Sequence, residues 1–248
     1  MIKLRNACLN YPVMGLKSHS LHAALSDKIG GVFRKGGNKG VNFVQALSNV
    51  NLTVNTGERL GVIGHNGAGK TTLLRVLSGV YIPTTGTVDV DGKISAMTDF
   101  TLGMDPNSSG IDNIIFRLTM MGVSYSNAKK AIDQIVEFSG IGDFINMPAS
   151  TYSTGMFMRL AFAISTHFVP DVLVLDEVIG AGDESFREKA LARLDQLVDS
   201  ARIVILSSHD LGSIEKYCTR CIVMEKGNVT FDGGPVSAID YYKKNIYA

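Results

Sequence analysis

The chain of 248 residues is 45% hydrophobic, enough to bury one large α/β core or a core with an inserted subdomain. Its 24 basic and 23 acidic residues give a formal net charge of +1, so the charge indicates no nucleic-acid partner and no acidic polymer. No stretch reaches the roughly 18 apolar residues of a membrane span, and residues 1–11 lack the apolar segment of a signal peptide.

The N-terminal segment is predicted to begin with a strand over residues 2–7, where apolar and polar residues alternate. This strand leads to Tyr11 and Pro12, and residues 12–42 then form an irregular, glycine-rich insert with five basic residues and one acidic residue. Leu21, Leu25 and Ile29 are spaced four apart, which predicts a short amphipathic helix over residues 20–29. That helix is either a contact element for a membrane partner or lipid headgroups, or an ordinary packed surface helix.

A phosphate-binding pattern, G-x-x-x-x-G-K-[ST], follows a predicted strand at 47–54 and a buried strand at 59–63. A helix over residues 72–77 comes next, so backbone N–H groups and a helix N-terminus are expected to face nucleotide phosphates. Lys70 is expected to neutralise the β- and γ-phosphates, and the Thr71 hydroxyl to hold Mg²⁺. The predicted nucleotide-binding residues here are Gly64, His65, Asn66, Gly67, Ala68, Gly69, Lys70, Thr71 and Thr72.

The middle of the chain changes from strand to helix. Residues 85–93 predict a strand that closes in an Asp-Gly turn, and residues 104–168 are mainly helical in pattern. Within them, residues 126–138 predict a helix with a capping start at Ser126. Its apolar stripe is Ile132, Ile135, Val136 and Phe138.

Two apolar strands, at 172–175 and 203–206, end in polar residues, as expected where a parallel sheet meets its ligand. Asp176 follows the first strand and is expected to hold Mg²⁺ directly or through water. Glu177 is expected to polarise the water that attacks the γ-phosphate, or to accept its proton. His209 follows the second strand and is placed to donate a hydrogen bond to a γ-phosphate oxygen and to orient Glu177.

The C-terminal part predicts a hairpin of strands 222–224 and 229–231 around a Gly227-Asn228 turn. Cys218 and Cys221 have C-x-x-C spacing, but a zinc site needs a second pair of ligands, so we interpret them as structural. The three cysteines of the chain make no disulfide framework, which favours a reducing compartment.

One further anion-binding turn identifies a family. Residues 152–155, Tyr-Ser-Thr-Gly, open an amphipathic helix with small and hydroxyl-bearing side chains. The order of phosphate loop, helical insert, this signature turn, Asp-Glu strand and His strand resembles the ATP-binding subunits of ABC transporters over nearly the whole chain. The resemblance implies an α/β fold: a P-loop NTPase core with a mixed sheet, an inserted α-helical subdomain and an N-terminal β region. It implies one ABC ATPase domain, with the core at about 1–98 and 169–248 and the helical subdomain at about 104–168.

The same resemblance implies ATP and Mg²⁺ as cofactors and a homodimer that shares two ATP sites. Ser153 and Gly155 of one subunit would then contact the γ-phosphate held by the other. Asp183 matches the loop that crosses the dimer interface, and Tyr11 matches the residue that stacks on adenine.

Departures from the common family pattern point to one branch. The signature Leu-Ser-Gly-Gly-Gln is Tyr-Ser-Thr-Gly-Met at residues 152–156, and Asp99 stands where a glutamine usually contacts Mg²⁺ and the attacking water. With the basic insert, these features resemble exporters of O-antigen, capsule and teichoic acid. This implies an integral membrane permease, a lipid-linked glycan as cargo and a place at the cytoplasmic face of the inner membrane, held there by the permease. Some members of the branch add a C-terminal carbohydrate-binding β-domain. The sequence ends at Ala248, so we expect no direct glycan recognition by this subunit.

Two other functions are open at this point. An ABC-type ATPase without a transport role usually carries two nucleotide domains or a long coiled coil, and neither is visible here. A phosphate-loop kinase for a small metabolite needs neither the signature turn nor a glutamate after the Mg²⁺ aspartate.

Overall fold

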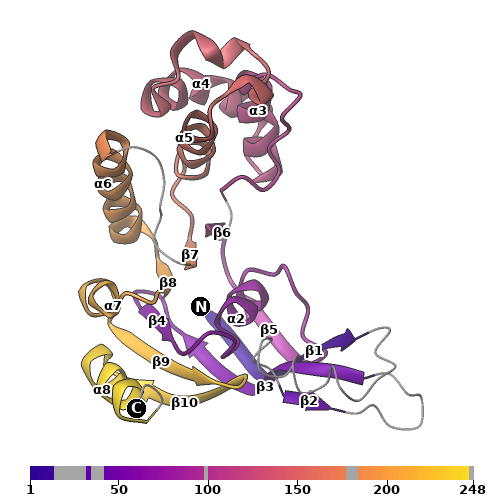
Figure 1. The fold of residues 1–248 in the computed structure, drawn as a ribbon, viewed down its shortest axis with the longest axis vertical. Coiled ribbons are helices and arrows are strands. Elements are labelled where there is room, and N and C mark those ends of the chain that lie inside the picture. Colours follow the sequence, from indigo (N-terminus) through magenta and orange to yellow (C-terminus); the bar gives the residue numbers. More distant parts are fainter. Residues whose placement is uncertain (14–31, 35–41, 98–99, 177–183, 246–248) are drawn as a thin grey trace. The chain divides into compact units, whose positions relative to one another are not determined.

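The structure is a computed structural model that describes residues 1–13, 32–34, 42–97, 100–176 and 184–245 (Figure 1). The chain divides into two compact units. The first, here called the core unit, comprises residues 1–94, 174–177 and 202–248. The second, the helical unit, comprises residues 95–173 and 178–201. The helix predicted over residues 20–29 lies outside the described residues.

One sheet of the core unit is antiparallel and contains the N-terminal strand. Its order is β2 (Val32–Arg34), β3 (Asn42–Val54), β1 (Ile2–Val13) and β5 (Thr85–Val90). Ile2, Leu4, Leu52 and Val54 are buried, as the alternating pattern predicts. β1 and β3 are longer than predicted because irregularities in their pairing, including one between Leu4 and Ala7, let the strands continue past the regular alternation.

The second sheet is mixed and carries the predicted buried strands. Its order is β10 (Asn228–Gly233), β9 (Arg220–Glu225), β4 (Arg59–Ile63), β8 (Ile203–Ser207), β7 (Val172–Asp176) and β6 (Ile94–Met97). β4 is parallel to both β8 and β9, with Val62 opposite Ser207. The carboxyl ends of β4 and β8 therefore lie at the same edge of the sheet, where ligands bind in open α/β folds.

The predicted hairpin of β9 and β10 is confirmed, but its turn is one residue earlier than expected. Glu225 pairs with Asn228, so the turn is made by Lys226 and Gly227, with φ of 47° and 82°. Positive φ at both central residues is the geometry of a type I′ hairpin turn. Two helices, α7 (Leu211–Tyr217) and α8 (Pro235–Asn245), accompany these strands in the core unit.

The two C-terminal cysteines pack beneath the strand that precedes the phosphate loop. A Cβ on Gly61 would lie 3.2 Å from the Sγ atoms of both Cys218 and Cys221. Burial raises the pKa of each thiol to about 12, so neither forms a thiolate readily. Among the described residues there is no group of three or more His, Cys, Asp or Glu side chains that could hold a metal ion.

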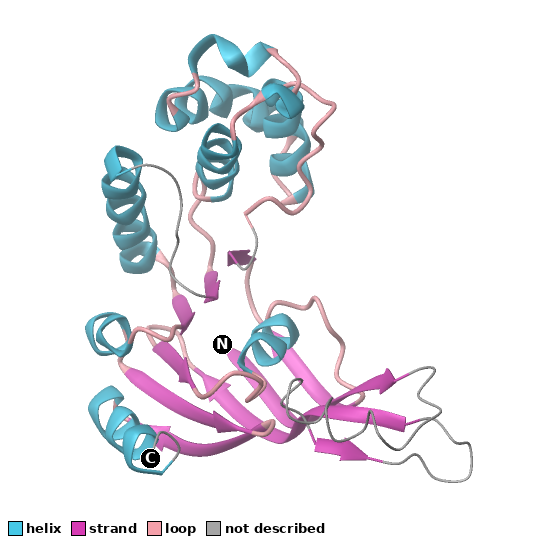
Figure 2. Cartoon of the chain, in the orientation of Figure 1, coloured by secondary structure: helices cyan, strands magenta, loops and turns pink. Residues whose placement is uncertain are grey.

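The helical unit contains the helices predicted between residues 104 and 168 (Figure 2). They are α3 (Gly110–Met120), α4 (Tyr125–Ser139), η1 (Gly142–Asn146), η2 (Ala149–Thr151) and α5 (Thr154–Ser165), and α6 (Glu184–Ser200) belongs to the same unit. Buried residues of α3, α4, η1 and α5 form one hydrophobic cluster, which includes Ile114, Leu118, Ile135 and Leu160. In the described part of the chain, no helix is long and apolar enough to cross a membrane.

The cap predicted for α4 at Ser126 is wrong. The capping residue is Ser124, whose Oγ accepts a hydrogen bond from the Asn127 N–H at 3.4 Å. Both serines fit a capping pattern, but the chain reverses at Gly122, with φ of 83°, and the helix starts as soon as that turn ends. Of the predicted stripe, Ile135 is fully buried, whereas Ile132, Val136 and Phe138 are partly buried at the edge of the cluster.

Candidate nucleotide site

The phosphate loop joins β4 to α2 (Lys70–Leu77), as the sequence predicts. The loop depends on glycine at two positions. A Cβ on Gly64 would lie 2.4 Å from the Met224 carbonyl oxygen, and one on Gly69 would lie 2.8 Å from that of Ala46. Gly69 has φ of 104° and directly precedes the first helical residue, so the N-terminus of α2 opens onto the loop.

The Lys70 side chain crosses the loop and is 8% exposed. Its Nζ donates hydrogen bonds to the carbonyl oxygens of Gly64, at 2.7 Å, and His65, at 3.1 Å. The His65 carbonyl also accepts the Ala68 N–H at 3.1 Å, which closes the loop on itself. An ammonium group beside two neutral carbonyls is well prepared to bind an anion, because phosphate oxygens are stronger acceptors than carbonyl oxygens.

Two predicted metal ligands lie side by side. The Thr71 hydroxyl at the start of α2 donates a hydrogen bond to Asp176 Oδ2 at the end of β7, at 2.8 Å. Both groups are oxygen donors of the kind Mg²⁺ prefers, and Mg²⁺ usually takes only one or two protein ligands, with water and phosphate filling the rest. The residues present therefore fit a Mg²⁺–nucleotide complex at this position.

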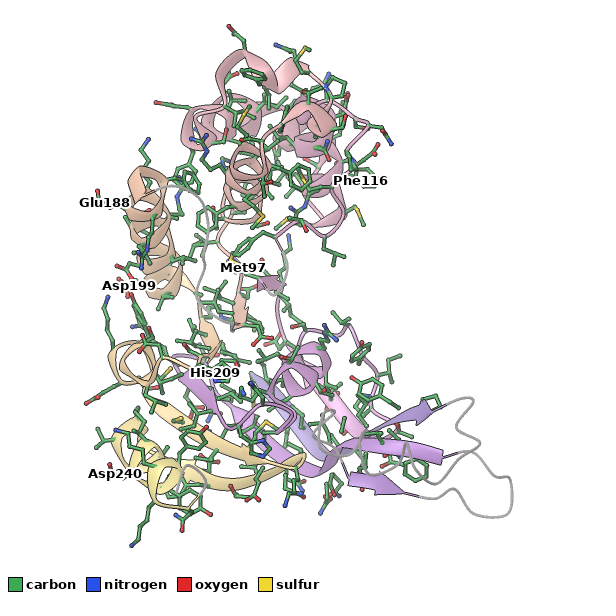
Figure 3. The ribbon with its side chains drawn as sticks, in the orientation of Figure 1. Met97, Phe116, Glu188, Asp199, His209 and Asp240 are labelled. Carbon is green, nitrogen blue, oxygen red and sulfur yellow. The ribbon has the colours of Figure 1, made fainter. Side chains whose placement is uncertain are left out.

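His209 lies two residues beyond β8 and is exposed (Figure 3). The pairing of β4 with β8 places it at the edge of the sheet from which the phosphate loop also starts. The next residue, Asp210, caps α7 by accepting the N–H groups of Gly212 and Ser213 at 3.1 and 3.2 Å. A hydrogen bond from the Ser213 hydroxyl lowers the pKa of the Asp210 carboxyl, which keeps the cap ionised. The chain direction after His209 is therefore fixed by a local cap.

Tyr11 from β1 reaches the helix that follows the phosphate loop. Its hydroxyl lies 3.5 Å from Thr72 Oγ1, and its partial burial raises the pKa of the phenol. Tyr81 packs edge-on against the Tyr11 ring, with centroids 5.8 Å apart. Arg75 of α2 in turn contacts the Tyr81 ring and donates a hydrogen bond to its hydroxyl at 3.3 Å. The sequence predicted nucleotide-binding roles for Tyr11 and for Thr72, but it singled out neither Tyr81 nor Arg75.

The signature turn lies in the helical unit, at the start of α5. Ser153 is exposed, and its Oγ caps the helix by accepting the Met156 N–H at 3.2 Å. Burial raises the pKa of Tyr152, whose hydroxyl donates to the Phe144 carbonyl at 2.8 Å. A Cβ on Gly155 would meet only Ser153 Oγ, at 3.9 Å, so nothing within the described chain requires glycine there.

Three predicted site residues, Asp99, Glu177 and Asp183, lie outside the described residues. The structure therefore brings together Lys70, Thr71 and Asp176 around the phosphate loop, and Tyr11 with Thr72 beside it.

Comparison with known proteins places this site in a family. The profile of the ABC transporter family matches residues 47–180. The O-antigen export system ATP-binding protein RfbE of Yersinia enterocolitica is 40% identical, and the match covers 90% of this chain and 93% of that protein. RfbB of Myxococcus xanthus, also named an O-antigen export system ATP-binding protein, is 38% identical over 83% of this chain. The chain spans about half of that relative, 47% of its length.

Solved structures show the same fold. A dimeric ATP-binding cassette in a post-hydrolysis state, bound to ADP and Pi, aligns with a TM-score of 0.68 and 21% identity, covering 95% of this chain and 99% of that one. A second structure, a dimeric bacterial ABC transporter cassette, aligns with a TM-score of 0.65 and 22% identity over the same shares of the two chains. The chain is an ATP-binding member of the ABC transporter family.

Proposed function

We propose that this chain is the ATP-hydrolysing subunit that powers export of a lipid-linked polysaccharide across the cytoplasmic membrane, together with a separate permease. The 2.8 Å hydrogen bond between Thr71 and Asp176 carries the ATPase part, because it joins the phosphate loop to a strand-end carboxylate. The names of the O-antigen relatives support the cargo, and the Yersinia protein matches over nearly its full length.

Each residue of the site has one task in this proposal. Lys70 exchanges its two carbonyl partners for the β- and γ-phosphate oxygens of ATP. Thr71 and Asp176 hold Mg²⁺, directly or through water, and the chemistry supplied by the ion is neutralisation of charge on the phosphate oxygens. Glu177 orients and deprotonates the attacking water, and His209 donates a hydrogen bond to the γ-phosphate. Asp99 adds a contact to the ion or the water.

The site is completed by a second copy of the chain. Ser153 and Gly155 belong to the helical unit, whereas the phosphate loop belongs to the core unit. Ser153 is exposed and Gly155 has open space beside its Cα, which suits contact with a γ-phosphate held elsewhere. We therefore propose a homodimer in which the signature turn of each copy closes over the ATP of the other, and Asp183 lies at the interface between them.

The permease binds the helical unit in this proposal. Leu102, Phe116 and Met120 are 73%, 54% and 67% exposed. Phe116, which Figure 3 labels, lies one turn before Met120 on α3. Gly103 places the loop of Leu102 against Met120, because a Cβ there would be 3.7 Å from the Met120 sulfur. Exposed apolar groups gathered in this way mark interaction surfaces. Binding there would hold the subunit at the cytoplasmic face of the membrane.

The chain acts as one ABC ATPase domain in this account, with a core at about 1–98 and 169–248 and a helical subdomain at about 104–168. The insert at 12–42 belongs to the core side of the sequence and has no assigned task.

The test is genetic and biochemical. Cells that lack this protein are expected to accumulate lipid-linked glycan on the inner side of the membrane. Expression of the wild-type protein is expected to restore export, whereas expression of Lys70→Ala protein is not. Purification of the wild-type protein from detergent-solubilised membranes should recover one permease. Recovery of a permease for another class of substrate, with no glycan accumulation, would overturn the polysaccharide proposal and leave the ATPase proposal standing.

A further inference from the structure

The hairpin turn between β9 and β10 lies against the outside of the phosphate loop. The Gly227 N–H donates a hydrogen bond to the Ala68 carbonyl at 2.8 Å, and the Gly227 carbonyl accepts the Ser48 N–H from β3 at 2.9 Å. One residue of the turn thus joins the loop to β3. Met224, just before the turn, packs against the start of the loop, where its carbonyl oxygen excludes a Cβ on Gly64.

The approach of these three segments leaves no room for side chains. A Cβ on Gly227 would lie 2.6 Å from the Ala46 carbonyl oxygen, and one on Gly69 would lie 2.8 Å from that same oxygen and 3.4 Å from the Gly227 Cα. Gly227 has φ of 82°, a conformation that side chains disfavour. Glycine at 227 is therefore required by both the space and the backbone.

The hydrogen bond to the Ala68 carbonyl also fixes the direction of the next N–H group, that of Gly69. In a planar trans peptide the C=O of Ala68 and the N–H of Gly69 point in opposite directions. When Gly227 holds that carbonyl toward the turn, the Gly69 N–H is turned away from it. A phosphate loop binds its anion with such backbone N–H groups. The turn therefore sets the direction of a donor that belongs to the loop.

We infer that Gly227 is a positioning residue for nucleotide binding: the turn holds the Ala68–Gly69 peptide so that its N–H is ready for phosphate before ATP arrives. This inference rests on the proposed ATP-binding function of the loop. Gly227 needs no contact with the nucleotide, and the relevant part of ATP is the triphosphate rather than the base.

The test compares Gly227→Ala with two matched variants of the full chain. Gly86→Ala meets the same strain, with φ of 84° and a Cβ 2.3 Å from the Asn6 carbonyl oxygen, but between β5 and β1. Gly57→Ala, with φ of 88° and no atom within 4 Å, controls for backbone conformation alone. Affinity for ATP and for inorganic tripolyphosphate is measured by calorimetry, and thermal stability by melting temperature.

Gly227→Ala is expected to weaken the binding of ATP and of tripolyphosphate alike by about tenfold or more, since the loss of one hydrogen bond to a charged group has an effect of that size. Gly86→Ala and Gly57→Ala should lower the melting temperature and leave both affinities near wild type. Equal affinity losses in Gly227→Ala and Gly86→Ala would overturn the inference. Wild-type protein that binds no ATP would instead contradict the proposed function.

Hydrogen exchange of the wild-type protein tests the same inference if Gly227→Ala fails to fold. Addition of ATP should slow exchange of the Gly227 amide, because a loop held by phosphate keeps the Ala68 carbonyl in place. The Gly57 amide, which donates to the Arg202 carbonyl at 2.7 Å away from the loop, should not change. An unchanged Gly227 amide alongside a protected phosphate loop would overturn the inference.

Discussion

Lys70 and Tyr11 are held in two different ways at the proposed ATP site. Lys70 already lies within the phosphate loop, bound to its carbonyls at 2.7 and 3.1 Å, so in the proposed function ATP would replace existing hydrogen bonds of an ordered side chain. Tyr11 is oriented from outside the loop, through the edge of Tyr81 and the hydroxyl of Thr72. If these residues act as proposed, phosphate recognition is built into one segment of the chain, whereas base recognition depends on packing between three segments.

Tyr81 is the residue through which base recognition can be tested. Tyr81→Leu removes the edge-on contact with Tyr11 and the partner of Arg75, and an aromatic pair contributes about 0.5–1.5 kcal/mol. We expect the affinity for ATP to fall by about two- to tenfold and that for inorganic tripolyphosphate to stay constant. Calorimetry with both ligands measures this.

The matched control is Tyr125→Leu, which removes an exposed tyrosine from α4 in the helical unit. It should change neither affinity. If Tyr81→Leu weakened tripolyphosphate as much as ATP, Tyr81 would be supporting the phosphate loop rather than the base platform.

Residues were predictable from sequence where chemistry and local spacing coincide. The phosphate-loop pattern and the carboxylate after an apolar strand each lie within a few residues, and the structure brings Thr71 and Asp176 together. Tyr81 and Gly227 were missed as parts of the site because their importance arises from distant partners, Tyr11 for one and Ala46 and Ala68 for the other. No local pattern encodes such approaches.

At the scale of elements, the strands of the core unit are joined at the end opposite the phosphate loop by one arginine. Arg220, at the start of β9, binds both carboxylate oxygens of Asp232 in β10 at 2.6 and 2.7 Å. The same guanidinium donates to the Thr53 carbonyl in β3 at 2.7 Å and to Glu58, just before β4, at 3.1 Å. These bonds raise the pKa of Arg220, so its charge is permanent.

Glu58 makes this junction sensitive to acid. Partial burial raises the pKa of its carboxyl, but hydrogen bonds from Asn55 and the charge of Arg220 lower it by more, so it lies below the ordinary value of 4.5. A carboxylate with a lowered folded-state pKa stabilises the fold above its unfolded-state pKa, and this contribution is lost as pH falls through the folded-state value.

Glu58→Gln is therefore expected to be less stable than wild type at neutral pH, and the difference should shrink as pH falls from about 5 to about 3. Urea denaturation at a series of pH values measures the difference in free energy of unfolding. A difference that stays constant over this range would show that the ionised carboxylate has no part in the junction.

The presence of the helices and strands was predicted better than the residues at which they begin and end. Both long strands of the antiparallel sheet continue past their predicted limits, because irregular pairing, near Leu4 and Ala7 in β1 and between Leu47 and Gln45 in β3, interrupts the alternation without ending the strand. The α4 cap and the hairpin turn were each misplaced, by two residues and by one. In both places a residue with positive φ, Gly122 or Lys226, fixes where the chain turns. The sequence alone does not distinguish that residue from its neighbours.

At the scale of the whole molecule, the two helix starts that we propose to bind the phosphates of ATP belong to different units. The N-terminus of α2 follows the phosphate loop in the core unit, and the Ser153 cap of α5 lies in the helical unit. Gly69, which precedes α2, and Ser153, which caps α5, each belong to the same unit as the helix they start. This separation suits a site that is completed when two copies meet.

The most direct test of the shared site is the molar mass of Glu177→Gln protein, measured by light scattering with and without saturating ATP. Slow hydrolysis should trap a dimer with ATP and leave a monomer without it. Two additions sharpen the result. Ser153→Asp keeps a residue that caps helices well but sets a negative charge against the γ-phosphate, whereas Ser124→Asp makes the same change at the start of α4.

The account predicts an ATP-dependent dimer for Glu177→Gln, the same dimer when Ser124→Asp is added, and a monomer when Ser153→Asp is added. Glu177→Gln protein that stays monomeric with saturating ATP, or a dimer that forms equally well with Ser153→Asp, would contradict it.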